Sequence, residues 1–131
     1  MNTFSKEERL CSRSLIDCLY AKGHRMMAFP YSVQWMTVDN MDVPTQVMIV
    51  APKRRLHHAV DRNRVKRLTR ECWRLHKQPL YDWLEQNHLQ IVLALVYVHN
   101  GILDYKQLDA KMDKLIVQLK NEIAQTAYEK T

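Results

Sequence analysis

Glycine is scarce in this chain, with only Gly23 and Gly101 among 131 residues. Two separated glycines cannot form a phosphate-cradling loop, so P-loops and the GXXG clamp of KH modules are excluded. Apolar runs are also short, and none reaches the roughly 18 residues that predict a membrane helix. The amino-terminal segment carries charges of both signs and no apolar core, so we expect no signal peptide and a cytoplasmic location.

Cysteine occurs in an odd number, at Cys11, Cys18 and Cys72. The spacing matches no zinc-binding pattern, and an odd count does not suggest a framework of disulfides. We therefore predict reduced thiols. Each should pack as a small apolar side chain.

Side chains suited to catalysis are not grouped along the chain. The candidates are Asp39, Asp42, His57, His58, Asp61 and Glu71. The first two fall in an expected turn, the last two lie among cations, and adjacent histidines point apart more often than together. Phosphodiester cleavage by a protein needs clustered carboxylates for metal ions or a histidine pair for acid and base catalysis. We predict no catalytic residue, no protein metal site and no organic cofactor.

Positive charge is concentrated between Lys53 and Lys77. This stretch holds ten of the 20 Lys and Arg residues and two of the 14 acidic residues, a net charge of +8, which leaves −2 for the rest of the chain. A solvated surface helix normally mixes both signs of charge to relieve repulsion. The imbalance therefore favours a binding surface for a polyanion.

Periodicity predicts a helix with two unlike faces in this stretch. Val65, Leu68, Cys72 and Leu75 recur at helical spacing and form the expected packing face. The opposite face holds Asn63 and the cations Arg62, Lys66, Arg67, Arg70, Arg74 and Lys77, with Arg64 nearer the boundary. Asp61 is the expected amino-terminal cap.

The predicted elements indicate an α+β fold. They are a helix over 5–22, strands over 31–36 and 47–51, the basic helix, a short helix over 80–87, a strand over 89–98 and a helix from 105. The first two strands are expected to pair as a hairpin. The strand over 89–98 is almost wholly apolar, which predicts a central position with both faces covered. We expect one domain, residues 1–131, with helices packed on a small, mostly antiparallel sheet.

Four aromatic side chains could stack on unpaired bases: Tyr20, Tyr31, Trp35 and Trp73. Aromatic residues on helices and strands that also build a core are more often buried. Trp73 is expected near the edge of the basic face, where it could stack on a base or cover the end of the sheet. Both interpretations remain open for all four residues.

The segment from Ala59 to Arg67, AVDRNRVKR, followed by Arg70 and Glu71, resembles the signature of the bacterial ribonuclease P protein component. The RNR triplet is its centre. The likeness extends over most of the chain, from the leading helix to the last one. It implies a left-handed β-α-β crossover that carries the basic helix.

The resemblance also implies a function. The catalyst would be a separate large RNA that positions magnesium ions, hydrolyses precursor tRNA and releases its 5′ leader. The protein would bind both this ribonuclease P RNA and the precursor tRNA, without a membrane or DNA partner. Ribonuclease P would thus be an endonuclease whose chemistry is carried by its RNA.

Individual residues take their implied roles from the same resemblance. RNA binding falls to Lys53, Arg54, Arg55, Arg62, Asn63, Arg64, Lys66, Arg67, Arg70 and Arg74. A cleft between the first helix and the sheet would hold the leader, lined by Ile16, Tyr20, Tyr31, Val33 and Trp35. The family usually has phenylalanine where Ile16 stands, so stacking on this helix would rest on Tyr20. The connection over 76–88 is longer than the family's usual one.

Other functions compete with this hypothesis. A general RNA-binding protein of the ribosomal type could use the same basic helix without serving catalysis. A nuclease acting alone would cut RNA without a ribozyme and would depend on carboxylates. DNA binding is less favoured, because the sequence lacks a helix, turn and recognition-helix pattern.

Overall fold

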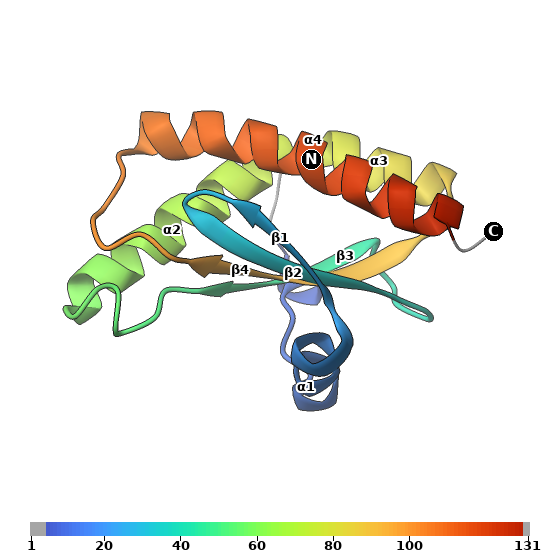
Figure 1. Cartoon of the computed structure of the whole chain (residues 1–131), viewed down its shortest axis with the longest axis horizontal. Coiled ribbons are helices and arrows are strands. Elements are labelled where there is room, and N and C mark those ends of the chain that lie inside the picture. The colour runs from blue at the N-terminus through green and yellow to red at the C-terminus, as the bar shows by residue number, and fades with distance from the viewer. Residues whose placement is uncertain (1–4, 130–131) are drawn as a thin grey trace.

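The computed structural model describes residues 5–129, and the side chains of residues 5–126. Within this part of the chain, four α-helices and a short 3₁₀ helix combine with four strands, an α+β fold (Figure 1). In chain order the elements are η1 (Lys6–Glu8), α1 (Arg13–Lys22), β1 (His24–Ala28), β2 (Tyr31–Val38), β3 (Thr45–Val50), α2 (Ala59–His76), α3 (Gln78–Gln86), β4 (Gln90–Tyr97) and α4 (Tyr105–Glu129).

The four strands form one sheet in the order β1-β2-β4-β3. Antiparallel pairing joins β2 to β1 and to β4, whereas β3 is parallel to β4. The predicted hairpin between the strands near 31–36 and 47–51 is therefore wrong, because β4 lies between β2 and β3. The central position of β4 is confirmed. Its apolar side chains need cover on both faces, and the centre of the sheet provides it.

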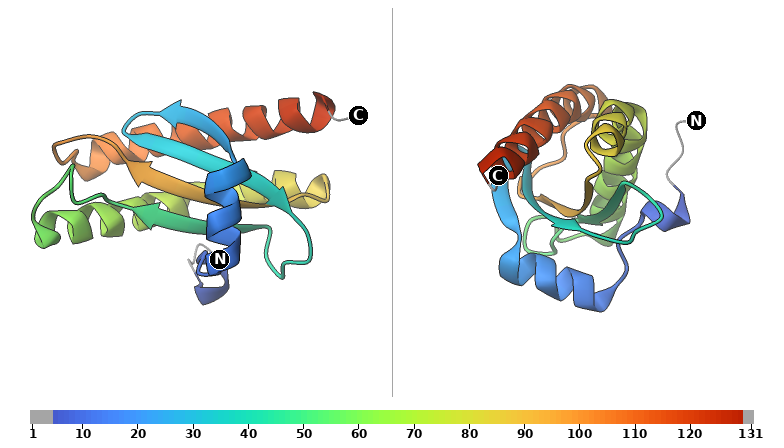
Figure 2. Two further views of the ribbon diagram at one scale, coloured as in Figure 1. Left: turned by 60° about the horizontal axis from the view of Figure 1, so that its bottom comes forward. Right: turned by 90° about the vertical axis from the view of Figure 1, so that its right-hand side faces the viewer.

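Helices cover both faces of the sheet. Figure 2 shows α2, α3 and α4 on one face and α1 crossing the other. The larger core, between the sheet and the three helices, includes Trp35, Leu93 and Trp73. The smaller core lies under α1 and includes Leu19 and Ala94. The chain passes from β3 to β4 through α2 and α3, and the left-handed sense of this crossover stays a prediction.

The first α-helix is shorter than the predicted span of 5–22. Ser12 accepts a hydrogen bond from the amide of Leu15 at 3.4 Å and caps α1. Between η1 and this cap the chain is not helical, and Arg9, in an extended conformation, forms a parallel bridge with Val47 at the outer edge of β3. The helix ends at Gly23, as predicted. A Cβ on this residue would lie 2.4 Å from the Leu19 carbonyl oxygen, so only glycine fits.

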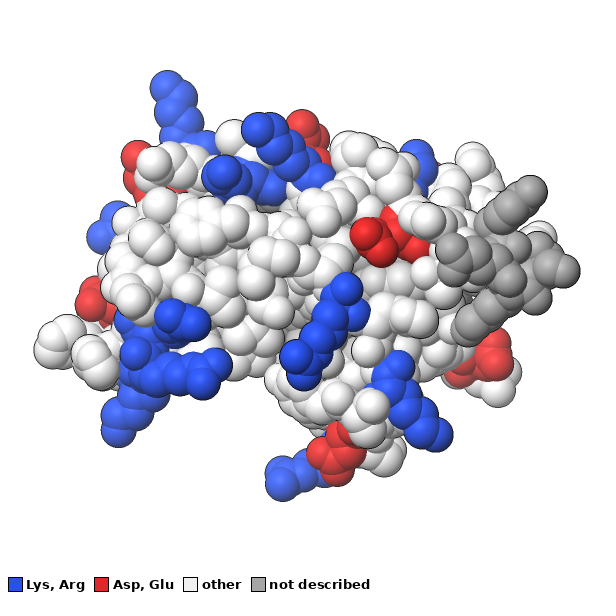
Figure 3. Space-filling view, in the orientation of Figure 1, with Lys and Arg blue, Asp and Glu red and all other residues white. Residues whose placement is uncertain are grey.

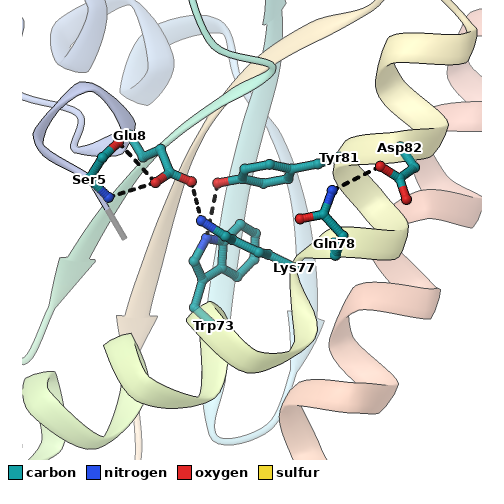
Figure 4. Close-up of polar contacts among 7 residues, drawn as sticks. All are labelled: Ser5, Glu8, Trp73, Lys77, Gln78, Tyr81 and Asp82. Carbon is teal, nitrogen blue, oxygen red and sulfur yellow. Dashed lines mark hydrogen bonds and ion pairs between the residues drawn. The ribbon is translucent and has the colours of Figure 1, made fainter. Parts of the chain in front are cut away.

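The junction between α2 and α3 contains a buried ion pair. Lys77 lies between the two helices, and its ammonium group contacts the Glu8 carboxylate from η1 (Figure 4). Its predicted place on the cationic face of the basic helix is therefore wrong. The backbone amide of Ser5 donates a hydrogen bond of 2.6 Å to Glu8. The ammonium also lies 4.9 Å from the ring centroid of Tyr81. These contacts tie the segment before α1 to the opposite layer of helices.

The last two helices follow the predicted pattern closely. α3 begins two residues before the predicted span, with Pro79 in its first turn, where the missing amide proton is tolerated. The predicted apolar side chains of α4 are all buried: Leu108, Met112, Leu115, Ile116, Leu119 and Ile123. In the described part of the chain, no helix combines the length and the apolar character needed to cross a membrane.

Candidate nucleic-acid interface

The basic helix α2 begins at Ala59, immediately after the loop that leaves β3. His58 is the residue at the cap position, and its side chain makes no capping hydrogen bond. Asp61 lies inside the first turn, so its predicted role as the cap is wrong. Its carboxylate still lies near the positive end of the helix dipole, where negative charge is favourable.

The packing face of α2 is rotated from the predicted one. The buried residues are Val65, Thr69, Cys72 and Trp73, whereas Leu75 is 39% exposed. Thr69 takes its place in the core because its hydroxyl shares a hydrogen bond of 2.7 Å with a buried tyrosine hydroxyl of β2. Trp73 is fully buried, which rules out its stacking on RNA at the edge of the basic face.

The cations of α2 and of the preceding loop form one surface. Six of the predicted RNA-binding residues are exposed and Lys66 is half-buried; we call these seven the basic surface: Lys53, Arg54, Asn63, Arg64, Lys66, Arg67 and Arg70. Figure 3 shows Lys and Arg side chains gathered over the loop before α2 and over its amino-terminal part. Acidic side chains are sparse there, so the repulsion between cations is left for a polyanion to relieve.

Three of the predicted RNA-binding cations make contacts within the protein. Arg62 donates hydrogen bonds of 2.9 Å from Nη1 to the carbonyl oxygens of Leu56 and His57, so it fixes the shape of the loop before α2. Arg55 donates to the side-chain oxygen of Asn100 at 3.3 Å, which joins this loop to the connection between β4 and α4. Both arginines therefore position the basic surface.

The third such cation, Arg74, pairs with an acid of its own helix. Its Nε and Nη2 donate hydrogen bonds of 3.1 and 2.5 Å to the Glu71 carboxylate. These hydrogen bonds hold the pKa of Glu71 below its usual value and raise the pKa of Arg74. The positive charge of Arg74 is thus partly neutralised, and the strongest field lies toward the amino end of α2.

On the other face of the sheet, α1 presents two of the predicted cleft residues. Ile16 is half-buried and packs on the small core beneath α1. Tyr20 is 45% exposed, so its ring is available for contact. Tyr20 therefore faces solvent and not the core, which is one of the two arrangements that the sequence left open.

The three predicted cleft residues of β2 are placed elsewhere. Tyr31, Val33 and Trp35 are at most 1% exposed and pack in the larger core, on the face opposite α1. Their assignment to the cleft is wrong. The larger apolar side chains of β2 point to the face of the sheet that α2, α3 and α4 cover, where more apolar surface is buried. The alternate side chains, Ser32 and Gln34, lie on the face of the sheet that α1 crosses. The alternation of side chains along a strand could have indicated this.

One further basic residue lies beside the basic surface, although its sequence position does not predict this. Arg9 lines a pocket of about 190 Å³ together with Arg70 of the basic surface and Met48 of β3. The extended segment before α1 brings Arg9 to this edge through its bridge to β3. Because Arg9 is far from the RNR triplet in sequence, only the sheet pairing shows that the two cations are neighbours.

Metal-ligating side chains are not clustered. Among the described residues, no group of three or more His, Cys, Asp or Glu side chains could hold a metal ion. His57 and His58 are exposed beside the basic surface. Asp39 and Asp42 line a separate pocket of about 290 Å³ with Glu85 at the far end of the sheet. Cys72 is buried, as predicted, whereas Cys11 is exposed, so the prediction that its side chain is packed is wrong.

Comparison with known sequences places the chain in a family. The family model described as Ribonuclease P matches residues 4–120. The ribonuclease P protein component of Porphyromonas gingivalis strain W83 is 31% identical over 124 residues, covering 94% of this chain and 90% of that protein. The ribonuclease P protein component of Chlorobium phaeobacteroides is 28% identical over 128 residues, covering 88% and 87%.

Solved structures show the same fold. A Staphylococcus aureus RNase P protein, a mutant with defective mRNA degradation activity, gives a TM-score of 0.70 at 21% identity and covers 88% of this chain and 90% of its own. The Thermotoga maritima RNase P protein gives 0.60 at 18% identity, with coverage of 83% and 94%. With the family model spanning most of its length, the chain belongs to the Ribonuclease P family.

Proposed function

We propose that this chain is one domain that works in the cytoplasm as the protein subunit of ribonuclease P. It binds the RNA component through the basic surface, and that RNA carries the hydrolysis that matures the 5′ end of tRNA. The observation that carries the proposal is the exposed row of cations on α2. Among the described residues, no group of three or more His, Cys, Asp or Glu side chains could hold a metal ion. A polyanion is the partner that such a surface fits.

The leader of precursor tRNA is proposed to lie against α1. Tyr20 provides an exposed aromatic ring on this helix, and unpaired bases stack on such rings. Ser32 of β2, half-buried on the same face of the sheet, offers a hydroxyl for hydrogen bonding. The leader and the RNA component thus contact different sides of the protein.

Magnesium is proposed as the metal of the reaction, held mainly by the RNA. The described residues supply no metal-ligating cluster of their own, so we assign no step to a protein-bound ion. The protein's contribution is to neutralise phosphates, which lets two polyanions and their metal ions approach each other.

The salt dependence of RNA affinity tests the basic surface. Replacing Arg64 by Gln should weaken binding to the RNA component and flatten the plot of log affinity against log salt by about one unit. The matched control is Lys120→Gln, in the carboxyl-terminal half of α4. The carboxyl end of α4 lies far from the start of α2 (Figure 1). If both substitutions leave affinity and slope unchanged, the basic surface is not the RNA site.

A second experiment tests the leader site. Tyr20→Ala should weaken binding of precursor tRNA by about fivefold or more, because one stacked base contributes about 1–3 kcal/mol. Tyr20→Phe keeps the ring and should bind as the parent does. Mature tRNA, which lacks the leader, serves as the control ligand. An equal loss for both tRNAs would place Tyr20 in contact with something other than the leader.

A further inference from the structure

The tip of the β1–β2 hairpin carries an exposed aromatic ring that the functions above do not use. Phe29 lies in the turn between the two strands, is 48% exposed and is absent from both apolar cores. Its neighbour in the preceding strand, Met27, is 60% exposed. Nearly half of the Phe29 surface is therefore open to solvent, so its ring can contact a ligand.

Two lysines of α4 line the same pocket as this ring. The Lys111 ammonium lies 5.8 Å from the centroid of Phe29, and Lys114 lines the same pocket of about 220 Å³. No acidic residue lines this pocket. The nearby Asp113 of α4 faces away, with its carboxylate 3.7 Å from His76 of α2. The pocket therefore combines an aromatic face with uncompensated positive charge.

A chain of contacts links the pocket to the loop that precedes α2. The ring of Phe29 meets that of His99 edge to face, with centroids 5.3 Å apart. His99 precedes Asn100, which accepts the hydrogen bond from Arg55 in the loop before α2. Figure 3 shows an uncharged area over the tip of the β1–β2 hairpin, with Lys and Arg side chains over α4 on one side and over the start of α2 on the other.

We propose that Phe29, with Lys111 and Lys114, binds an unpaired nucleotide of the RNA that covers the basic surface. The base stacks on Phe29, and the two lysines contact the flanking phosphates. The occupant is the RNA component and not the leader, because Phe29 is linked through His99 and Asn100 to the loop before α2, whereas the leader is assigned to α1. This inference rests on the proposed function and adds a base-stacking site to it.

Affinity for the RNA component tests the site, measured with the full chain. Phe29→Ala should weaken binding between about fivefold and about 150-fold, the range that corresponds to one stacked base. Phe29→Tyr keeps the ring and should bind as the parent does. Phe29→Leu keeps an apolar side chain without the aromatic face and should bind as weakly as the alanine variant. The control is Val117→Ala, which alters an apolar residue of α4 that is 56% exposed.

The lysines and the RNA source need separate measurements. Lys114→Gln should flatten the salt slope by about 0.7–0.9 unit, whereas Phe29→Ala should leave the slope unchanged. Ultraviolet crosslinking of the parent complex should attach RNA to the peptide that contains Phe29. If Phe29→Ala instead weakens binding only to precursor tRNA with a leader, the occupant is the leader and the assignment is overturned.

The outcomes also separate this inference from the proposed function. If Arg64→Gln weakens RNA binding and Phe29→Ala does not, the basic surface stands and the stacking site is refuted. If neither variant weakens binding, the basic surface is not the RNA site, and both the proposed function and the stacking site are refuted. All Phe29 variants should have the melting temperature of the parent, measured by circular dichroism, since the side chain is outside the core. If the alanine variant has a much lower melting temperature, the comparison of Phe29→Leu with Phe29→Tyr tests the stacking site.

Discussion

Breaking the ion pair between Glu8 and Lys77 should destabilise the fold severely, whereas removing both charges should not. The two side chains are 6% and 4% exposed, respectively. Glu8 also accepts hydrogen bonds of 2.6 and 3.0 Å from the amide and hydroxyl of Ser5 (Figure 4). Each charge is therefore compensated only by groups inside the protein.

The magnitude follows from this burial. Glu8→Gln leaves a buried ammonium without its counter-charge, and Lys77→Met leaves a buried carboxylate, each of which should lower the free energy of unfolding by about 3–5 kcal/mol. A domain is stable by only about 5–15 kcal/mol, so either variant loses a large share. The double variant Glu8→Leu/Lys77→Met keeps the volume but buries no charge, and it should lie within about 1 kcal/mol of the parent or above it.

Urea unfolding at pH 7, followed by circular dichroism, measures these differences. The matched control is Glu7→Gln, an exposed neighbour of Glu8 that should change stability by less than about 0.5 kcal/mol. The reasoning is refuted if each single variant loses less than about 1 kcal/mol and the double variant loses their sum, because two independent surface charges would behave in that way.

The same pair predicts a pH dependence. Burial raises the pKa of Glu8, but the hydrogen bonds from Lys77 and Ser5 outweigh it and hold the pKa below its usual value of 4.5. A carboxyl group whose pKa is lowered by folding stabilises the fold at any pH above its pKa in the unfolded state. This stability is lost as the pH falls through its pKa in the folded state. The parent should therefore lose more stability than the double variant when the pH is lowered from 5 toward 3.

Three further predictions concern the basic helix and the core. Arg62→Ala should speed amide hydrogen exchange in the loop before α2, because the alanine side chain cannot donate the two hydrogen bonds made by Nη1; unchanged exchange would show that the loop holds its own shape. Tyr31→Phe should cost about 1–3 kcal/mol in urea unfolding, since it leaves the buried Thr69 hydroxyl without its partner, and Thr69→Val added to it should restore part of the loss. Burial, with smaller effects of nearby carboxylates, raises the pKa of the Cys72 thiol to about 11, so a thiol reagent at pH 8 should label the exposed Cys11 and reach Cys72 only after unfolding; equal labelling rates in the folded protein would contradict the buried placement.

The features that were predictable from sequence depend on local patterns. Charge density identified the basic helix, because ten cations and only two acids in one stretch leave a large surplus of positive charge. The apolar run of β4 predicted its central position, and the spacing of apolar residues in α4 predicted its buried face. These patterns succeed because burial on one or both faces is decided by the element itself.

The predictions that were wrong concern features that depend on which other elements pack against a helix or strand. Periodicity could not distinguish Leu75 from Trp73 as the packing residue of α2, because that choice is made by where α3 and α4 lie. Alternation in β2 was read correctly as two faces, but the larger apolar side chains, Trp35 among them, were assigned to the cleft and not to the core. The pairing of β3 with β4 is non-local, and no turn signal reports it.

The most direct test of the central claim is cleavage of a precursor tRNA at low magnesium by the protein alone, by the RNA component alone, and by the two together. The account predicts efficient removal of the 5′ leader only when both are present, with Arg64→Gln protein requiring more magnesium to reach the same rate. Cleavage by the purified protein alone would contradict it, because the catalyst would then lie in this chain.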